Sequence, residues 1–175
     1  LLRAGTEIAT PQVYDPESFL PRFLPVRASL VALAAASSDG ASFAPQLARA
    51  DCILGEVLIR ARRHAEARAY FEECRRLCEQ HLRTQPGDLA VRADLVGACY
   101  GLDEIAAFFG DESELDAALR AVAEAEELAR LAPDAARLDD LSRRRGCLAA
   151  RLVLRGDRAL ARSMLEENRR MLDDA

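Results

Sequence analysis

The chain has 175 residues, of which half are hydrophobic and 30% are charged, and its net charge is −5. This composition indicates one globular domain that can bury a core without disulfides or metal, and it excludes a disordered chain. All 24 basic residues are Arg. The absence of Lys excludes a Gly-Lys-Ser/Thr phosphate loop and a Schiff-base lysine, and the acidic balance argues against a nucleic-acid partner. We expect no cofactor.

The five cysteines have no disulfide-framework spacing, which favours reduced thiols and a cytoplasmic protein. We find no signal peptide. The longest apolar run, Ala28 to Ala36, is too short to cross a bilayer, so we expect no membrane partner. The first residue is Leu1 rather than Met, and we therefore expect a piece of a longer polypeptide.

The N-terminal segment, residues 1–43, is predicted to hold an irregular stretch to Tyr14 and then a capping helix. Asp15 and Pro16 form a helix start, with Asp as the N-cap and Pro at the first helical position. Pro21 and Pro25 are predicted to break or kink this helix. Regular helix should resume near Val26 and end at the turn cluster 37–40.

Residues 44–175 are predicted to form three helical hairpins. Turns are expected at residues 62–64, 110–111 and 156–157 within the hairpins, and at 84–88 and 133–134 between them. Apolar residues at helical spacing mark the inward face of each helix. The inward set includes the following residues: Ala67, Phe71, Cys74, Cys78, Phe109, Ala118, Leu119, Val122, Leu160, Ala161, Leu165 and Leu172.

The three second helices carry the same mark, an Ala followed four residues later by an apolar residue. The marks are Ala67 with Phe71, Ala118 with Val122, and Ala161 with Leu165. Their alanines lie 51 and then 43 residues apart, within or just above the periods of helical repeat arrays. Strand signals are nearly absent. The chain is therefore predicted to be all-α, with stacked antiparallel hairpins and an N-terminal capping helix.

This pattern resembles the tetratricopeptide-repeat family. The family's small and aromatic positions are filled by Leu54-Gly55, Leu58, Ala67, Phe71 and Cys74 in the first repeat; by Ile105-Ala106, Phe109, Ala118, Val122 and Ala125 in the second; and by Leu148-Ala149, Leu152, Ala161, Leu165 and Asn168 in the third. The spacing exceeds the usual 34 residues. The long-helix variety looks like repeat regions attached to bacterial Ser/Thr kinases.

The resemblance implies a short solenoid that binds a protein or peptide in a groove lined by the first helix of each hairpin. Carrying the groove positions across gives these residues: Arg49, Cys52, Glu56, Ile59, Arg60, Tyr100, Asp103 and Arg143. Arg49, Arg60 and Arg143 are candidates for gripping an acidic peptide by bidentate pairing; solvated helix arginines are the alternative.

Cys74, Cys78 and His81 lie at i, i+4 and i+7 on one helix, a spacing that would let them share a zinc ion. All three also lie on the stripe that should face the core, and we interpret them as core residues rather than metal ligands. The isolated Cys52 and Cys147 receive the same interpretation.

No nucleophile motif is present, and neither His64 nor His81 has an evident catalytic partner. We therefore predict a non-enzymatic scaffold or regulatory domain that binds a protein or peptide. The alternatives are a self-association module that forms homo-oligomers and a Cys/His sensor of metal or redox state.

Overall fold

The computed structural model describes residues 16–111 and 114–173. The described part of the chain is all-helical and contains no strand, as the sequence predicts. The irregular stretch to Tyr14 and the Asp15 cap lie outside the described residues.

The α-helices run in chain order as α2 (Pro16–Ala36), α3 (Ala44–Arg60), α4 (His64–Leu82), α5 (Leu89–Phe109), α6 (Glu114–Leu131), α7 (Ala135–Leu154) and α8 (Arg158–Asp173), with the 3-10 helix η1 (Gly40–Phe43) before α3. Their bounds follow the predicted turns at residues 62–64, 110–111 and 156–157.

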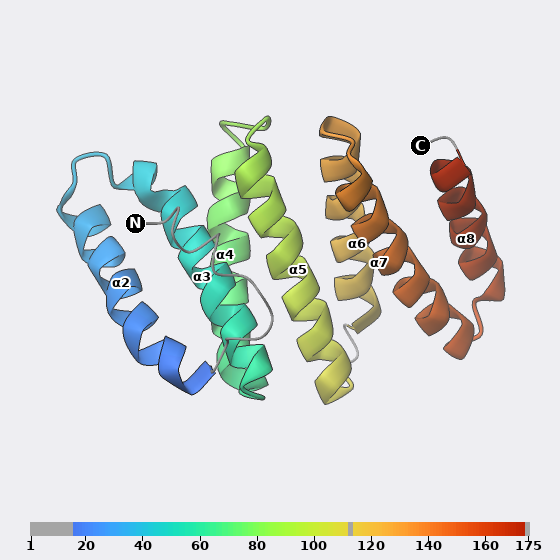
Figure 1. Cartoon of the computed structure of the whole chain (residues 1–175), viewed down its shortest axis with the longest axis horizontal. Coiled ribbons are helices and arrows are strands. Elements are labelled where there is room, and N and C mark those ends of the chain that lie inside the picture. Colours follow the sequence, from blue (N-terminus) through green and yellow to red (C-terminus); the bar gives the residue numbers. More distant parts are fainter. Residues whose placement is uncertain (1–15, 112–113, 174–175) are drawn as a thin grey trace.

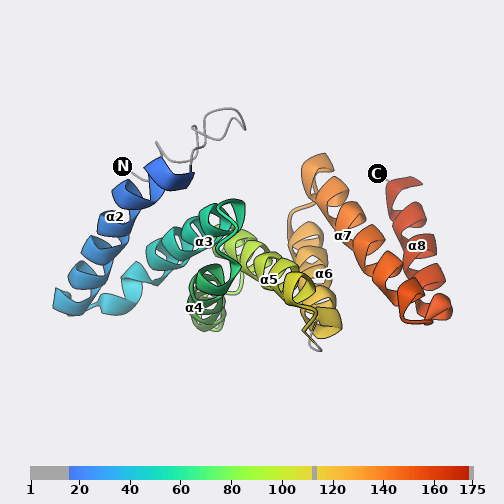
Figure 2. The same ribbon diagram turned by 90° about the horizontal axis from the view of Figure 1, so that it is seen from below.

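The helices form a row in which each packs against its neighbours in sequence (Figure 1), with α2 and α8 at its two ends. In Figure 2, α4 and α6 lie toward the lower side of this row. Helix α5 also packs directly against α3, two helices earlier. No Cα atom of α7 lies within 8 Å of α5, so the spacing between first helices differs along the row. Regular stacking of hairpins therefore stays a prediction.

Local sequence explains where the helices begin and end. Asp88 caps α5, because its carboxylate accepts hydrogen bonds from the backbone N–H groups of Ala90 and Val91 at 3.1 Å. Gly110 ends the same helix in the left-handed region, with φ of 64°, where glycine has no Cβ penalty. Asp134 caps α7 through the N–H of Arg137 at 2.8 Å.

The first apolar cluster joins α2, α3, α4 and α5, with Ala121 of α6, around Phe71, which is buried on α4. A Cβ atom added to Gly55 of α3 would lie 2.7 Å from the Phe71 ring, and one added to Gly101 of α5 would lie 2.3 Å from it. Only a residue without a side chain fits at either position. Phe71 therefore holds α3 and α5 against α4 at the same time.

The second apolar cluster joins α5, α6, α7 and α8. Its buried members are Val96 from α5, then Ala118, Val122, Ala125, Leu128, Ala129, Leu141, Leu148, Ala149, Leu152 and Ala161. The expectation that Ala118 and Ala161 lie buried is confirmed. Helices α5 and α6 contribute to both clusters and connect them.

Helix α2 runs unbroken through Pro21 and Pro25, so a break there, with regular helix resuming only near Val26, is wrong. A kink at the two prolines stays a prediction. The two prolines are four residues apart and exposed, so they lie on one solvent-facing side. Water can reach the carbonyl groups that lose their N–H partners there, and the helix survives.

The length of α2 also bears on the membrane. Residues Ser18–Ala36 are long and apolar enough to cross a bilayer by length and composition, although the run Ala28 to Ala36 alone is too short. Only 6% of this segment is buried in the structure. Core helices of soluble proteins and signal sequences can have the same length and apolar composition. The cytoplasmic location therefore stays a prediction.

Several residues expected to face inward are exposed instead. They are Phe109, Leu119, Leu160, Leu165, Leu172 and Cys147. The reason is clearest for α8, which among the described helices packs against α7 alone and so buries a narrow strip containing Ala161 and Asn168. Leu165 lies beside this strip rather than on it.

We predict that Gly101→Ala destabilises the fold by about 1–3 kcal/mol, because the added methyl group overlaps the Phe71 ring. Gly146→Ala is the matched control, since Gly146 also lies within a helix but its added Cβ meets nothing within 4 Å. That change should stabilise by roughly 0.5–1 kcal/mol. Urea unfolding of both variants measures the difference, and an equal effect of the two would contradict the packing at Phe71.

Candidate functional site

The predicted groove residues separate into two groups. Arg49, Glu56 and Arg60 lie on α3, with Cys52 buried beneath them and Ile59 half-buried. Tyr100 and Asp103 lie one turn apart on α5, and Arg143 lies on α7. Three buried aspartates lie on these helices, and each pairs with an arginine of another helix.

The first such carboxylate is Asp51 of α3, which is completely buried. Arg27 of α2 donates to both of its oxygens. Burial raises the pKa of Asp51, and the arginine only partly offsets this shift. The pair therefore ties α2 to α3, because separating the helices would leave a buried carboxylate without a partner.

The second carboxylate is Asp94 of α5, to which Arg49 donates at 2.6 Å. Asp94 is buried, and burial raises its pKa against the opposing effect of Arg49. The side chain of Arg49 is 43% exposed. The predicted groove arginine thus links α3 to α5 and still offers part of its surface to solvent.

Asp103 of α5 is the third, and it pairs with Arg151 of α7. Asp103 is buried, so this predicted groove residue supports the structure rather than lining an open surface. The backbones of α5 and α7 lie apart, so the Asp103–Arg151 ion pair connects the two helices through side chains.

Tyr100 of α5 also contacts α7. The guanidinium of Arg144 lies 4.5 Å from the centre of the Tyr100 ring, and Arg144 in turn donates to Asp140 at 2.7 Å. The cation–π contact and the ion pair fix the orientation of the ring. Tyr100 remains 44% exposed. Partial burial, followed by the nearby charge of Glu104, raises the pKa of its hydroxyl.

The remaining groove residues are more exposed. Glu56 has a raised pKa because neighbouring protein atoms displace water from it, an effect that Arg49 and Arg60 partly offset. Arg60 is exposed at the last turn of α3. Arg143 is exposed and pairs with Asp139 of its own helix at 3.2 Å. The positive charge of Arg143 is therefore already paired with a carboxylate of its own helix.

The three residues whose spacing would allow a shared zinc ion, Cys74, Cys78 and His81, have different surroundings in the structure. Cys74 and Cys78 are buried with their sulfur atoms 3.9 Å apart, and hydrogen bonding with Cys52 and Cys78 raises the pKa of Cys74. His81 instead contacts Asp88 at 3.0 Å. Among the described residues, no three His, Cys, Asp or Glu side chains could hold a metal ion together.

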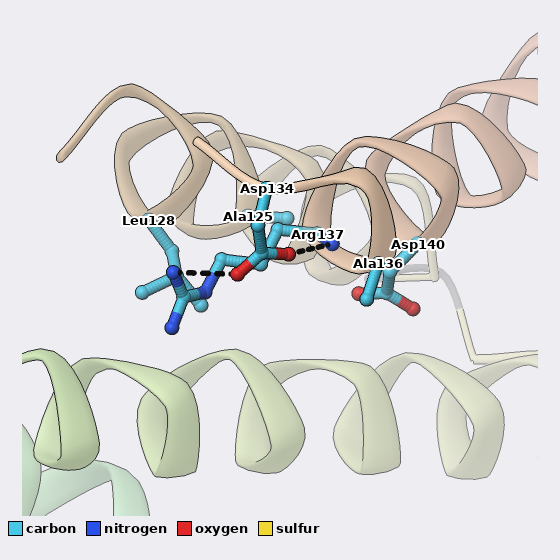
Figure 3. Close-up of a pocket in the computed structure, with 6 residues that line it drawn as sticks. All are labelled: Ala125, Leu128, Asp134, Ala136, Arg137 and Asp140. Atoms are coloured by element: carbon cyan, nitrogen blue, oxygen red, sulfur yellow. Dashed lines mark hydrogen bonds and ion pairs between the residues drawn. The ribbon is translucent and has the colours of Figure 1, made fainter. Parts of the chain in front are cut away.

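A hollow with a volume of about 320 Å³ lies where α7 begins (Figure 3). Its polar lining groups are already engaged: Arg137 pairs with Asp134 at 2.9 Å, and Asp140 holds Arg144. The other lining residues are Ala125, Leu128 and Ala136. Such a hollow offers no convergent set of polar groups for catalysis.

Sequence reasoning missed Asp51, Asp94, Arg144 and Arg151. A signal was present for the two aspartates, because each interrupts an apolar stripe: Asp51 lies between Leu47 and Leu54 at helical spacing, and Asp94 lies three residues after Val91. A charged residue on a buried stripe predicts a partner from another helix. Nothing in the sequence specifies which arginine that partner is.

Comparisons of the chain with protein-family models, curated proteins and solved structures gave no match. The tetratricopeptide resemblance therefore rests on the motif residues alone.

We predict that Arg49→Gln lowers the free energy of unfolding by about 2 kcal/mol near neutral pH, because it strips a buried carboxylate of its partner. Asp94 already has a raised pKa, so the fold loses stability as the pH rises through that pKa and gains it as the carboxyl takes up a proton. The variant's deficit relative to wild type should shrink as the pH falls toward about 4.

Arg143→Gln is the control for this prediction, since its pair is exposed on both sides and should contribute less than about 0.5 kcal/mol. Urea unfolding at the two pH values measures both variants. A deficit for Arg49→Gln that is independent of pH would show that Asp94 does not depend on Arg49.

Proposed function

We propose that the chain is a non-enzymatic scaffold or regulatory domain that binds a protein or peptide, with a tetratricopeptide-like arrangement of hairpins. The proposed binding face lies over α3, α5 and α7 and consists of Arg49, Glu56, Arg60, Tyr100 and Arg143. A cytoplasmic location, a bacterial source and a place in a longer polypeptide are part of the same proposal.

The observation that carries this proposal is the exposed and oriented ring of Tyr100. Tyrosine and arginine are enriched among the residues that contribute most to protein interfaces. A partner that covers the Tyr100 ring gains apolar contact area and gives up little side-chain entropy, because Arg144 already restricts the ring. The position on α5 also places the ring on one of the two helices that contribute to both apolar clusters.

Charge on this face is mixed. Arg60 and Glu56 lie close enough on α3 for the arginine to offset part of the rise in the pKa of the carboxyl group that burial causes. Arg49 and Arg143 each have a carboxylate partner within the chain. An acidic peptide would therefore share these arginines with Asp94 and Asp139.

We predict that Tyr100→Ala weakens peptide binding by about tenfold, equivalent to about 1.4 kcal/mol. Phe109→Ala is the matched control: Phe109 is also an exposed aromatic residue of α5, but nine residues further on it points to the opposite side of the helix. A peptide array probed with wild type and both variants measures the effect.

The result that would contradict the proposed face is loss of binding in Phe109→Ala with binding retained in Tyr100→Ala. Failure of the wild-type chain to bind any peptide or protein would contradict the scaffold function itself.

We further predict that the double variant Arg60→Ala, Arg143→Ala weakens binding of acidic peptides more than binding of neutral ones. Both arginines are exposed, so their loss should leave the unfolding free energy nearly unchanged. Fluorescence anisotropy with matched acidic and neutral peptides measures the difference. An equal loss for the two peptide classes would show that the face does not select acidic partners.

A further inference from the structure

A second hollow, with a volume of about 310 Å³, is lined by α4, α5 and α6. Its walls are α4 and α6, and in the described part of the chain no Cα atom of one lies within 8 Å of the other. Helix α5 packs against both walls and forms the floor with Leu102, Ala106 and the buried thiol of Cys99. The hollow shares no residue with the proposed peptide-binding face.

Ion pairs lie at both ends of the hollow. Arg120 of α6 donates to Glu79 of α4 at 2.6 Å, which joins the two walls. Arg68 of α4 lies 3.6 Å from Asp111, which follows the end of α5. Arg68 and Glu79 are eleven residues apart on α4, so the space between the two ion pairs is about 16 Å long. A hollow bounded in this way suits a small molecule better than a long peptide.

Three charged side chains of the hollow make no ion pair or hydrogen bond with the described residues. They are Arg75, which is half-buried, and Glu72 and Asp116, which are exposed. Glu72 lies one turn before Arg75 on α4, and Asp116 lies one turn before Arg120 on α6. The helices alternate in direction along the row, so α4 and α6 run the same way (Figure 1). Each wall therefore presents a carboxylate and, one turn later, a guanidinium.

The electrostatic surroundings of Cys99 locate the two guanidinium groups. Burial raises the pKa of this thiol to about 11, with a further contribution from the charge of Glu124, and the charges of Arg120 and Arg75 oppose the rise. The two arginines of opposite walls are therefore both within electrostatic range of the Cys99 end of the floor. The two unpaired carboxylates precede them along the walls.

We propose that this hollow binds a free α-amino acid with an apolar side chain. The ligand carboxylate accepts hydrogen bonds from Arg75, the ammonium group lies between Glu72 and Asp116, and the side chain covers Leu102 and Ala106. A simple anion would face the two unpaired carboxylates, and a simple cation would face the guanidinium of Arg75. Only a molecule that carries both charges has each of them opposed. The volume is at the lower end of the range for ligand sites, as a molecule of this size requires.

The test is a titration of the full chain, labelled with ¹⁵N, with L-leucine and two-dimensional NMR as the readout. Because the hollow is open to water, we expect a roughly millimolar dissociation constant. Amides of residues 68–75, 99–106 and 116–120 should shift. Arg75→Gln should weaken binding by about tenfold, since the ligand carboxylate loses a charge-assisted hydrogen bond. Arg83→Gln removes an exposed arginine that follows α4 outside the hollow, and it should leave binding unchanged.

Analogues of leucine test the two charges separately. N-acetyl-leucine lacks the ammonium group and leucinamide lacks the carboxylate, so each should bind more weakly than leucine by about fivefold or more. In the double variant Glu72→Gln, Asp116→Asn, leucine should lose its advantage over N-acetyl-leucine. The NMR spectrum of each variant also shows whether it is folded.

Three results would overturn the proposal. The first is a wild-type spectrum that does not change at about 20 mM leucine. The second is N-acetyl-leucine that binds as tightly as leucine, which would show that the site recognises a carboxylate alone. The third is unchanged affinity in Arg75→Gln, which would place the ligand elsewhere.

Discussion

The packing of one aromatic ring between two glycines is the constraint on which the rest of the structure depends. Phe71 of α4 lies against Gly55 of α3 and Gly101 of α5, and the space at both glycines is too small for a methyl group. Three helices therefore have fixed distances from one another at a single point. Tyr100 is the residue next to Gly101, so the same packing determines where the proposed binding face begins.

Beyond this point the helices are joined by buried carboxylates. Asp51, Asp94 and Asp103 each pair with an arginine of another helix, and together they connect α2 to α3, α3 to α5, and α5 to α7. Such pairs add little net stability compared with apolar packing, but breaking one leaves a buried charge without a partner. They therefore favour one arrangement of helices over others that would bury the same apolar area.

The side-chain contacts between α5 and α7 bear directly on the proposed binding face. The two helices contact each other through the side chains of Asp103, Arg151, Tyr100 and Arg144, without close approach of their backbones. A tyrosine in this setting is exposed on one side and held on the other. Under the proposed function, a partner covers the exposed side of the ring, while the carboxylates and arginines on the other side stay paired with one another.

The sequence specified the helices far better than it specified the contacts between them. Turn residues such as Gly110 and Asp88 act locally, so the bounds of α5 followed from the chain itself. Leu165 is exposed because, among the described helices, α8 packs against α7 alone. The local sequence of α8 does not indicate how many helices pack against it. The sequence marks Gly101 as unusual, because it lies on the buried stripe between Ala98 and Ile105. The reason for a glycine there is the Phe71 ring, which lies thirty residues earlier in the chain. The pairing of Asp94 with Arg49 likewise depends on tertiary distance.

Native-state hydrogen exchange of the full chain, measured helix by helix, tests the central claim most directly. Because α5 belongs to both apolar clusters and contacts Phe71, its amides should exchange most slowly, while those of α2 and α8 at the ends of the row should exchange fastest. Amides of α5 that exchange as fast as those of α8 would contradict an architecture built around this helix.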